Sequence, residues 1–593
     1  MSMRIKDLFI IALALVVGAA SLIGAAMQLE GIGSAREEMG LVATTALENA
    51  PPSLAFATVA LGAFRGLLVN VLWIRADNLK EEGKFFDAKQ LAEWITILQP
   101  RFSAVWDFHA WNMAYNISVA IPNTQPEERW RWVRNGYELL RDRAIPLNPN
   151  SIILYRSLAW IFQHKIGGVS DDCHRYYKQQ LALSIRAVLG EHPDNAFFDR
   201  LAGAAPSLEA LLAEPAVAEF VNDLQQADPA FANRNRLVDT YLSLRQQPGR
   251  FSDEAFAVID YWRDSEALEA FDIFARAAKL RSEWQFDIDY MIELNRRFGP
   301  RDIDDPEMTY PLNWEHPAAH AMYWGALGLD VAGRPDQYRV DEKNTDRIIF
   351  HSLQMLYRRG RVVLYEQEEH WGRAVFELPD MRMFDVTNEF WQDIIGKYEE
   401  FEGGNPKAVR GGHKNFLENA VLMFYQSGHT RKAEQIYRQL RTQHEYDDQG
   451  FVREEYKVPM MTFMRNRLRE ELESIGIHDA AEFIVTTLKE SYFRYALHED
   501  DEAAGRENLA REVYTLYQRE MGEYEQERVG LPPMDRLRYA ALMMFLEDPM
   551  YPEHMRGNLL SRIQIERPEM FERLRRQEER LFEEFQRQQQ QQP

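Results

Sequence analysis

The chain has 593 residues, more than one hydrophobic core normally organises, so its length predicts several domains or an elongated array of repeats. Hydrophobic residues make up 46% of the sequence, which is ample for packed cores and argues against disorder over most of the length. The formal net charge of −23 excludes nucleic acid as an expected partner and disfavours an anionic lipid surface under the body, because phosphate binding needs a basic face.

An uncharged apolar run, residues 8–27, lies near the start of the chain. It matches the thickness of a hydrocarbon core and exceeds the usual core of a signal peptide, so we expect a transmembrane anchor within residues 1–30. A cleaved signal peptide is the alternative, because residues 24–26 have the small side chains of a cleavage site. Arg4 and Lys6 precede the run, which predicts a single-pass protein of the cell membrane with a cytoplasmic N-terminus and an extracytoplasmic body.

A second apolar run, residues 54–74, leaves the topology open. Arg65 near its middle costs roughly 2.5 to 3.5 kcal/mol in a spanning helix, and Asn70 adds to that cost. The run continues without a break into Trp73 and Leu79, so we expect a buried first helix of the body. If the run spans the membrane instead, the body returns to the cytoplasm.

A helix-hairpin pattern appears within residues 72–168 and repeats. An aromatic, a large apolar, a small and a second aromatic residue at offsets of 3, 4 and 7 share one helix face, as Tyr155, Leu158, Ala159 and Phe162 do. An earlier copy consists of Trp106, His109, Ala110 and Met113, and a later copy of Leu417, Ala420, Val421 and Phe424. The pattern resembles the tetratricopeptide repeat (TPR), a two-helix unit of about 34 residues.

The resemblance implies an all-α fold, a TPR-like α-solenoid of helical hairpins behind the transmembrane helix, with an irregular middle region. Residues 361–365 and 374–378 are short apolar runs compatible with strands, in a region that otherwise predicts helices and loops. Gly299 and Pro300 interrupt the helical periodicity and suggest a boundary. The expected segments are the anchor (1–30), membrane-proximal hairpins (31–195), a helical linker subdomain (196–300), an irregular, mostly helical region (301–412), C-terminal hairpins (413–567) and a charged helix with a disordered glutamine tail (568–593).

Three groups of residues raise the question of chemistry. His316 and His320 have the spacing of two zinc ligands on a helix, but Pro317 between them predicts a helix start with His316 as its cap. Residues 171–174 read Asp-Asp-Cys-His, which we interpret as a helix N-terminus whose acids favour the helix dipole. Residues 403–414 form a glycine-rich basic stretch that we expect to be a flexible connector, with an anion contact as the alternative. We expect no metal and no cofactor, and the single cysteine excludes an internal disulfide.

The resemblance also implies a site. In the resembled family the first helices of successive hairpins line a concave surface, and residues beside the packing positions face it. The matching positions are Asp107, Trp111, Arg156, Trp160, Gln163, Asn415, Glu418 and Tyr425. Trp111 and Trp160 fall at equivalent positions, and such a pair beside Asp and Arg suits an anchor for a peptide. The alternative is that both tryptophans belong to the core.

These features predict a non-enzymatic, membrane-anchored scaffold that binds protein partners of unknown identity at the bacterial cell envelope. One alternative is an envelope enzyme with a site in residues 300–415, around His316, His320 and His413. Another is a structural subunit of a larger membrane complex, which would expose large apolar surfaces.

Overall fold

The structure is a computed structural model that describes residues 64–591 except 192, 334–339, 367–372, 403–406, 447–449, 474–476, 521–530 and 549. The expected anchor (1–30), residues 54–63 of the apolar run 54–74, the start of the glycine-rich stretch and the last two residues therefore lie outside the described residues. Among the helices that are described, none is both long and apolar enough to cross a membrane.

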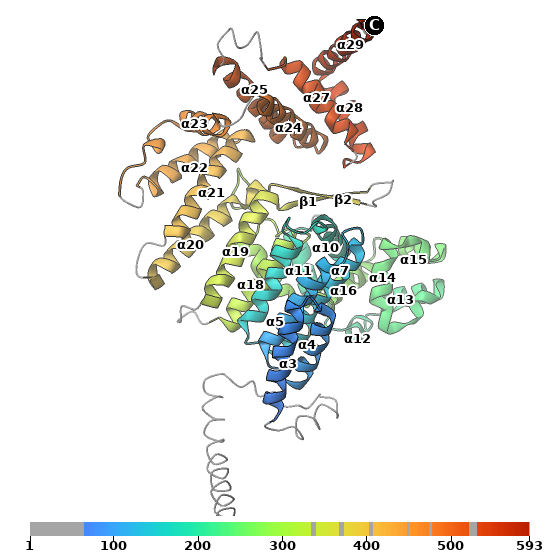
Figure 1. The fold of residues 1–593 in the computed structure, drawn as a ribbon. Coiled ribbons are helices and arrows are strands. Elements are labelled where there is room, and N and C mark those ends of the chain that lie inside the picture. The colour runs from blue at the N-terminus through green and yellow to red at the C-terminus, as the bar shows by residue number, and fades with distance from the viewer. Residues whose placement is uncertain are drawn as a thin grey trace, which may run out of the picture.

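The fold is mostly helical, with many helices packed together (Figure 1). The first group of elements comprises α3 (Phe64–Glu81), α4 (Phe85–Leu98), α5 (Ser103–Trp111), η1 (Asn112–Ile117), α6 (Ser118–Ala120), α7 (Pro126–Glu138), η2 (Leu139–Ala144), α8 (Ile145–Leu147), α9 (Ile152–Trp160), η3 (Ile161–Ile166) and α10 (His174–Leu189). The three η segments here are π-helical turns. Two of them, η1 and η2, lie within longer helices, and η3 ends the helix that begins with α9. The helical chain is interrupted at residues 99–102 and 167–173.

The next group surrounds a core of its own. It comprises α11 (Asn195–Ala202), α12 (Leu208–Leu211), α13 (Pro215–Ala227), η4 (Pro229–Ala232), η5 (Arg234–Arg236), α14 (Leu237–Gln246), η6 (Pro248–Arg250), α15 (Asp253–Tyr261), α16 (Glu266–Ser282) and α17 (Ile288–Phe298). Phe220, Phe231 and Phe271 lie in this core with almost no exposed surface. In contrast, α11 and α17 pack into the main core of the molecule.

The region that the sequence presents as irregular contains long helices and a small sheet. Its elements are α18 (Pro317–Ala332), α19 (Val340–Arg359), β1 (Arg361–Glu366), β2 (Arg373–Leu378), η7 (Met381–Met383) and α20 (Phe384–Glu402). The two apolar runs do form strands, which pair antiparallel with Arg361 opposite Leu378. The first turn of α18 begins at Pro317, and the His316 side chain accepts a hydrogen bond from the Ala318 amide, so the predicted cap is confirmed.

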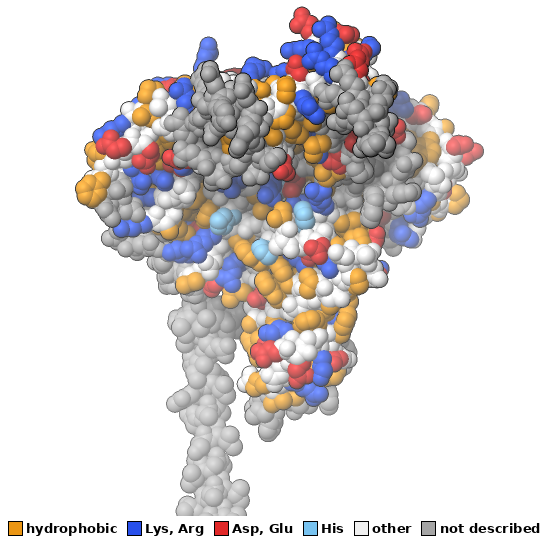
Figure 2. Space-filling model, turned by 45° about the horizontal axis from the view of Figure 1, so that its top comes forward, with side chains coloured by type: hydrophobic (Ala, Val, Ile, Leu, Met, Phe, Trp, Pro, Cys, Tyr) orange, Lys and Arg blue, Asp and Glu red, His pale blue; other side chains and the backbone are white. Residues whose placement is uncertain are grey.

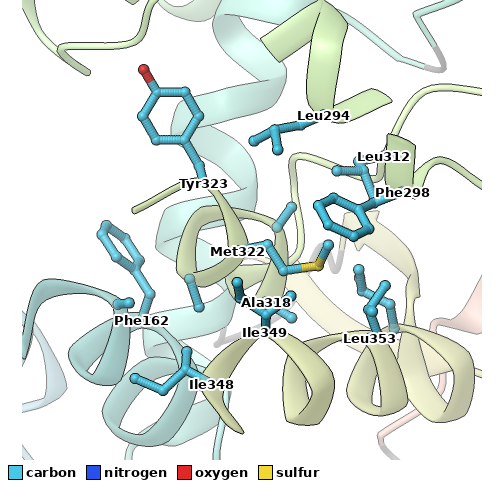
Figure 3. Close-up of a cluster of buried hydrophobic side chains, with 14 of the residues drawn as sticks. Phe162, Leu294, Phe298, Leu312, Ala318, Met322, Tyr323, Ile348, Ile349 and Leu353 are labelled. Carbon is cyan, nitrogen blue, oxygen red and sulfur yellow. The ribbon is translucent and has the colours of Figure 1, made fainter. Parts of the chain in front are cut away.

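Helix α18 lies at the centre of the main core. It packs against α9, η3 and α19, and Figure 3 shows Met322 and Ala318 among side chains of α17, α19 and η3. Gly328 makes the closest approach, since a Cβ there would lie 2.5 Å from the Cβ of Tyr155 on α9. A residue of the first repeat region is thus packed directly against a helix more than 150 residues later in the chain.

The C-terminal elements complete the molecule. They are α21 (Lys407–Gln426), α22 (Thr430–Gln443), η8 (Glu454–Tyr456), α23 (Met460–Glu473), α24 (Ile477–Ala496), α25 (Asp500–Glu520), α27 (Met534–Glu547), α28 (Glu553–Glu566) and α29 (Pro568–Gln591). Helices α24 to α29 surround a separate core, which the sheet joins through Phe376 and Leu378 (Figure 1). Helix α29 continues to Gln591, so it includes glutamines that the sequence predicts to be disordered.

The expectation of a flexible connector over residues 403–414 is wrong from Lys407 onward, where the chain is helical. Gly411 and Gly412 suggested a loop, but Gly412 serves helix packing. A Cβ at Gly412 would lie 2.6 Å from the Trp391 ring, so its absence allows α20 and α21 to pack closely.

Candidate functional site

Trp111 and Trp160 each stack on the residue four positions later. Trp111 and Tyr115 have ring centroids 4.0 Å apart, and Trp160 and His164 have centroids 4.8 Å apart. Each tryptophan is the last α-helical residue before a π-helical turn, η1 or η3, so the same local geometry occurs in both hairpins. Trp111 is 43% exposed, whereas Trp160 is half-buried and packs against the main core.

The two stacked pairs meet. The Tyr115 hydroxyl lies 3.3 Å from Nδ1 of His164. Burial raises the pKa of Tyr115, and burial followed by the nearby Lys165 ammonium lowers the pKa of His164. At neutral pH both side chains are therefore uncharged, and the contact joins a phenol to a neutral imidazole. Trp111, Tyr115, His164 and Trp160 form one continuous surface, called here the aromatic row.

The remaining candidate residues of these hairpins contact their own chain. Arg156 pairs with Asp341 of α19, and the Gln163 amide donates to the Ile348 carbonyl (2.6 Å) and to Ser352 Oγ (2.7 Å), also on α19. Gln163 is therefore buried and Arg156 is engaged by the same helix. Burial raises the pKa of Asp107, against the opposing effects of Ser157 and Arg156.

The three candidates on α21 have different surroundings. Asn415 is exposed, whereas Glu418 is buried and accepts hydrogen bonds from Tyr456 and from Arg467 (2.6 Å). Glu418 therefore joins α21 to η8 and α23. Tyr425 lies at the edge of a cleft, and its hydroxyl donates to Glu512 Oε1 at 3.1 Å. Burial and the Glu512 carboxylate raise the pKa of Tyr425, so the hydroxyl stays protonated.

The cleft has a volume of about 480 Å³ and lies between α21, α22, α23 and α25. This is within the range of sites that hold a peptide side chain or a small ligand. Its apolar lining includes Leu422, Met461, Met464, Leu509 and Leu516. Its charged and polar lining includes Arg465, Arg511, Glu512, Asn508 and Thr515.

Two glycines determine how the walls of the cleft meet. Gly428 has a φ of +84° in the turn between α21 and α22, a conformation that other residues rarely adopt. Gly505 on α25 packs against the end of α21, where an added Cβ would lie 1.5 Å from the Gln426 carbonyl oxygen. The spacing between α21 and α25 therefore depends on the missing side chain at Gly505.

His316, His320 and His413, around which an alternative site was expected, are all buried. His316 Nε2 lies 3.2 Å from Glu377 Oε1 on β2, and Lys178 Nζ of α10 lies 2.6 Å from the other oxygen of that carboxylate. Neither His316 Nε2 nor Glu377 Oε1 makes a well-directed hydrogen bond, so their contact is mainly electrostatic. His320, four residues after His316, is fully buried, and its Nε2 lies 2.9 Å from the Trp314 carbonyl.

His413 has other partners. Its Nε2 lies 2.8 Å from Asn388 Oδ1, and its Nδ1 lies 3.3 Å from His444 Nε2. Burial and the neighbouring imidazole lower the pKa of His413 to about 3. Within the part of the chain that the structure describes, no three His, Cys, Asp or Glu side chains are grouped as metal ligands would be.

Asp171 interacts with two basic side chains as well as with the backbone at the start of α10. It lies 2.6 Å from Lys165 Nζ and 3.2 Å from Arg129 Nη1, and it accepts a hydrogen bond from the Cys173 amide. All three charged side chains are buried, so removing one would leave the others without full compensation. Cys173 is buried next to them, and burial raises the pKa of its thiol.

Sequence reasoning did not select several residues of these two surfaces. Tyr115 and His164 lie four residues after the tryptophans, a spacing that places them on the same helix face and could have identified them. Met461, Arg465 and Arg511 reach the cleft only because α23 and α25 pack against α21, for which the sequence carries no local signal. No known family model matches the chain, and no curated protein matches it either.

Proposed function

We propose that the protein is a non-enzymatic, TPR-like scaffold at the bacterial cell envelope that binds a segment of a partner protein. In this proposal residues 1–30 hold it in the membrane, with the body outside the cytoplasm. The repeated helical hairpins support the repeat assignment, because α5 and α9, which carry equivalent residues, pack against each other. A rigid array of helices loses little entropy when it binds a partner.

The observation that carries this proposal is the cleft between α21 and α25, with its apolar lining and charged rim. Met461 is exposed beside the buried Met464. Methionine side chains adapt to differently shaped apolar groups, which suits the binding of a peptide side chain. Arg465 and Arg511 are exposed at the same cleft, so a bound segment is expected to combine apolar residues with acidic ones.

The aromatic row supplies a second contact surface in this proposal. Partly exposed tryptophans are frequent anchors of protein interfaces, because they bury a large area with few rotatable bonds. Its four rings contact one another, so they are already ordered before a partner binds.

The test compares two variants of the full-length, detergent-solubilised protein. Met461→Glu with Arg465→Glu reverses the character of the cleft at two exposed positions. Met544→Glu, at an exposed methionine of α27, is the matched control. We expect the cleft variant to recover at least about tenfold less of the partner, which corresponds to roughly 1.4 kcal/mol, and the control to recover as much as the wild type.

A photo-crosslinking residue at position 461 should attach to that same partner in intact cells. Circular dichroism should show the same helical content for all variants. Undiminished recovery by the folded cleft variant would reject the cleft as the binding site.

A further inference from the structure

Helices α3 and α4 expose more large apolar side chains than their length would predict. Ile74 is 61% exposed and Trp94 is 48% exposed, and the other exposed apolar side chains of this pair are Leu68, Val71, Phe86 and Ile97. Elsewhere in the described residues such side chains are more widely scattered, and scattered ones need no explanation. Figure 2 shows hydrophobic side chains on the lower part of the molecule, where α3 to α5 lie in Figure 1.

The charged residues are not distributed evenly along the α3–α4 pair. The two helices are joined by the short turn 82–84 and pack against each other, so they run antiparallel. Charged residues are concentrated near that turn, whereas residues 66–74 and 94–100 contain none and are flanked at the opposite end by Arg65 and Arg101. Ile74 and Trp94 lie at similar heights on the pair, and Val71 and Ile97 lie further toward that opposite end, called here the apolar end.

The chain that precedes the described residues leads to this end. Residues 1–63 precede Phe64, the first residue of α3, and they include the uncharged run 8–27. Residues 64–98 contain five basic and five acidic side chains and so carry no net charge, although the whole chain carries −23. The electrostatic repulsion that keeps the acidic body away from a lipid surface is thus absent here.

We propose that the apolar end of the α3–α4 pair lies in the interfacial layer of the lipid bilayer, with Val71, Ile74, Trp94 and Ile97 against the acyl chains. The proposal rests on the anchor in the proposed function, because the anchor brings this end to the membrane. Tryptophan is enriched at such interfaces, where its ring is apolar and its N–H can reach water or a headgroup. Contact at two points fixes the orientation of the body relative to the membrane.

The experiment places one fluorescent label at a time in the full-length chain, reconstituted into phosphatidylcholine vesicles. In a Cys173→Ser background, Ile74→Cys and Trp94→Cys carry an environment-sensitive dye, and Ile565→Cys of α28, at a side chain 78% exposed, is the matched control. Lipids with a quencher on the acyl chain should reduce the emission at positions 74 and 94 at least about twofold. The emission at position 565 should not change.

Each outcome is decisive. Chain that floats with the vesicles while the label at position 74 stays unquenched would overturn this inference and leave the anchor intact. A label that is shielded equally in vesicles and in detergent, and that crosslinks to a second copy, would assign the face to a dimer and also overturn it. Chain that does not float with vesicles would refute the membrane anchor of the proposed function, and this inference with it.

Discussion

Replacing Glu377 by glutamine is expected to lower the free energy of unfolding at pH 7 and to have much less effect in acid. Burial alone would raise the pKa of Glu377, but the His316 imidazole and the Lys178 ammonium lower it from 4.5 to about 2. A shift of about 2.5 pKa units corresponds to roughly 3 kcal/mol of stability when the carboxylate is ionised. The side chain is only 14% exposed, so solvent screens these interactions weakly.

The sign follows from the direction of the shift. The folded-state pKa lies below the unfolded value, so the contribution is fully present above about pH 4.5 and is lost as the pH falls toward 2. At pH 3 it should have decreased to roughly 1.5 kcal/mol. The difference in urea midpoint between wild type and Glu377→Gln, followed by circular dichroism at pH 7 and pH 3, measures this decrease.

Glu389→Gln is the matched control for this comparison. Glu389 pairs with Arg301, but its side chain is 55% exposed, so the substitution should have a small effect that is similar at both pH values. A Glu377→Gln effect of equal size at pH 7 and pH 3 would refute the assignment of stability to the charge of this carboxylate. It would then reflect packing between β2, α10 and α18 instead.

Three further predictions concern other parts of the molecule. Gly505→Ala should destabilise the protein by about 1 to 3 kcal/mol or more and weaken partner binding, because α25 must move away from α21. Gly557→Ala on α28, where a Cβ meets no atom within 4 Å, is the control and should be neutral or stabilising, and thermal unfolding measures both effects. Cys173 should react with a thiol reagent at least about a hundredfold faster in denaturant than in the folded state, because it is buried and its pKa is raised; equal rates would contradict its position. Trp111→Ala combined with Trp160→Ala should reduce recovery of a partner without changing helical content, and unchanged recovery would remove the aromatic row from the binding surface.

Local signals in the sequence predicted individual helix boundaries. Pro317 at a first turn and Gly299 after a last turn marked where α18 begins and α17 ends, because these residues act on the backbone directly. The apolar runs 361–365 and 374–378 showed their strands only as a possibility, since a run of five residues does not separate a strand from a short helix.

The exposure of the candidate site residues depends on contacts between helices that are far apart in the sequence, and the periodicity of one helix does not predict such contacts. Gln163 was expected to face a groove, and its position on the helix is consistent with that expectation. However, the Ile348 carbonyl and Ser352 of α19, more than 180 residues later, accept its hydrogen bonds. The periodicity of one helix shows which face is apolar, but it does not show which distant helix covers that face.

The two groups of hairpins therefore differ in what they can offer a partner. At the first, α18 and α19 cover α9 from one side and Gly328 brings α18 against Tyr155. Of the aromatic row, only Trp111 remains exposed, and the other three rings are half-buried. At the second, Gly505 seats α25 against the end of α21, and both helices line the cleft beside Tyr425. The Gly328 contact thus brings a covering helix onto the first surface, whereas the Gly505 contact positions two helices that line the cleft at the second. Partner binding should consequently depend more on the cleft than on the aromatic row. In one recovery experiment, the Met461 variant should therefore lose more of the partner than the Trp111 variant.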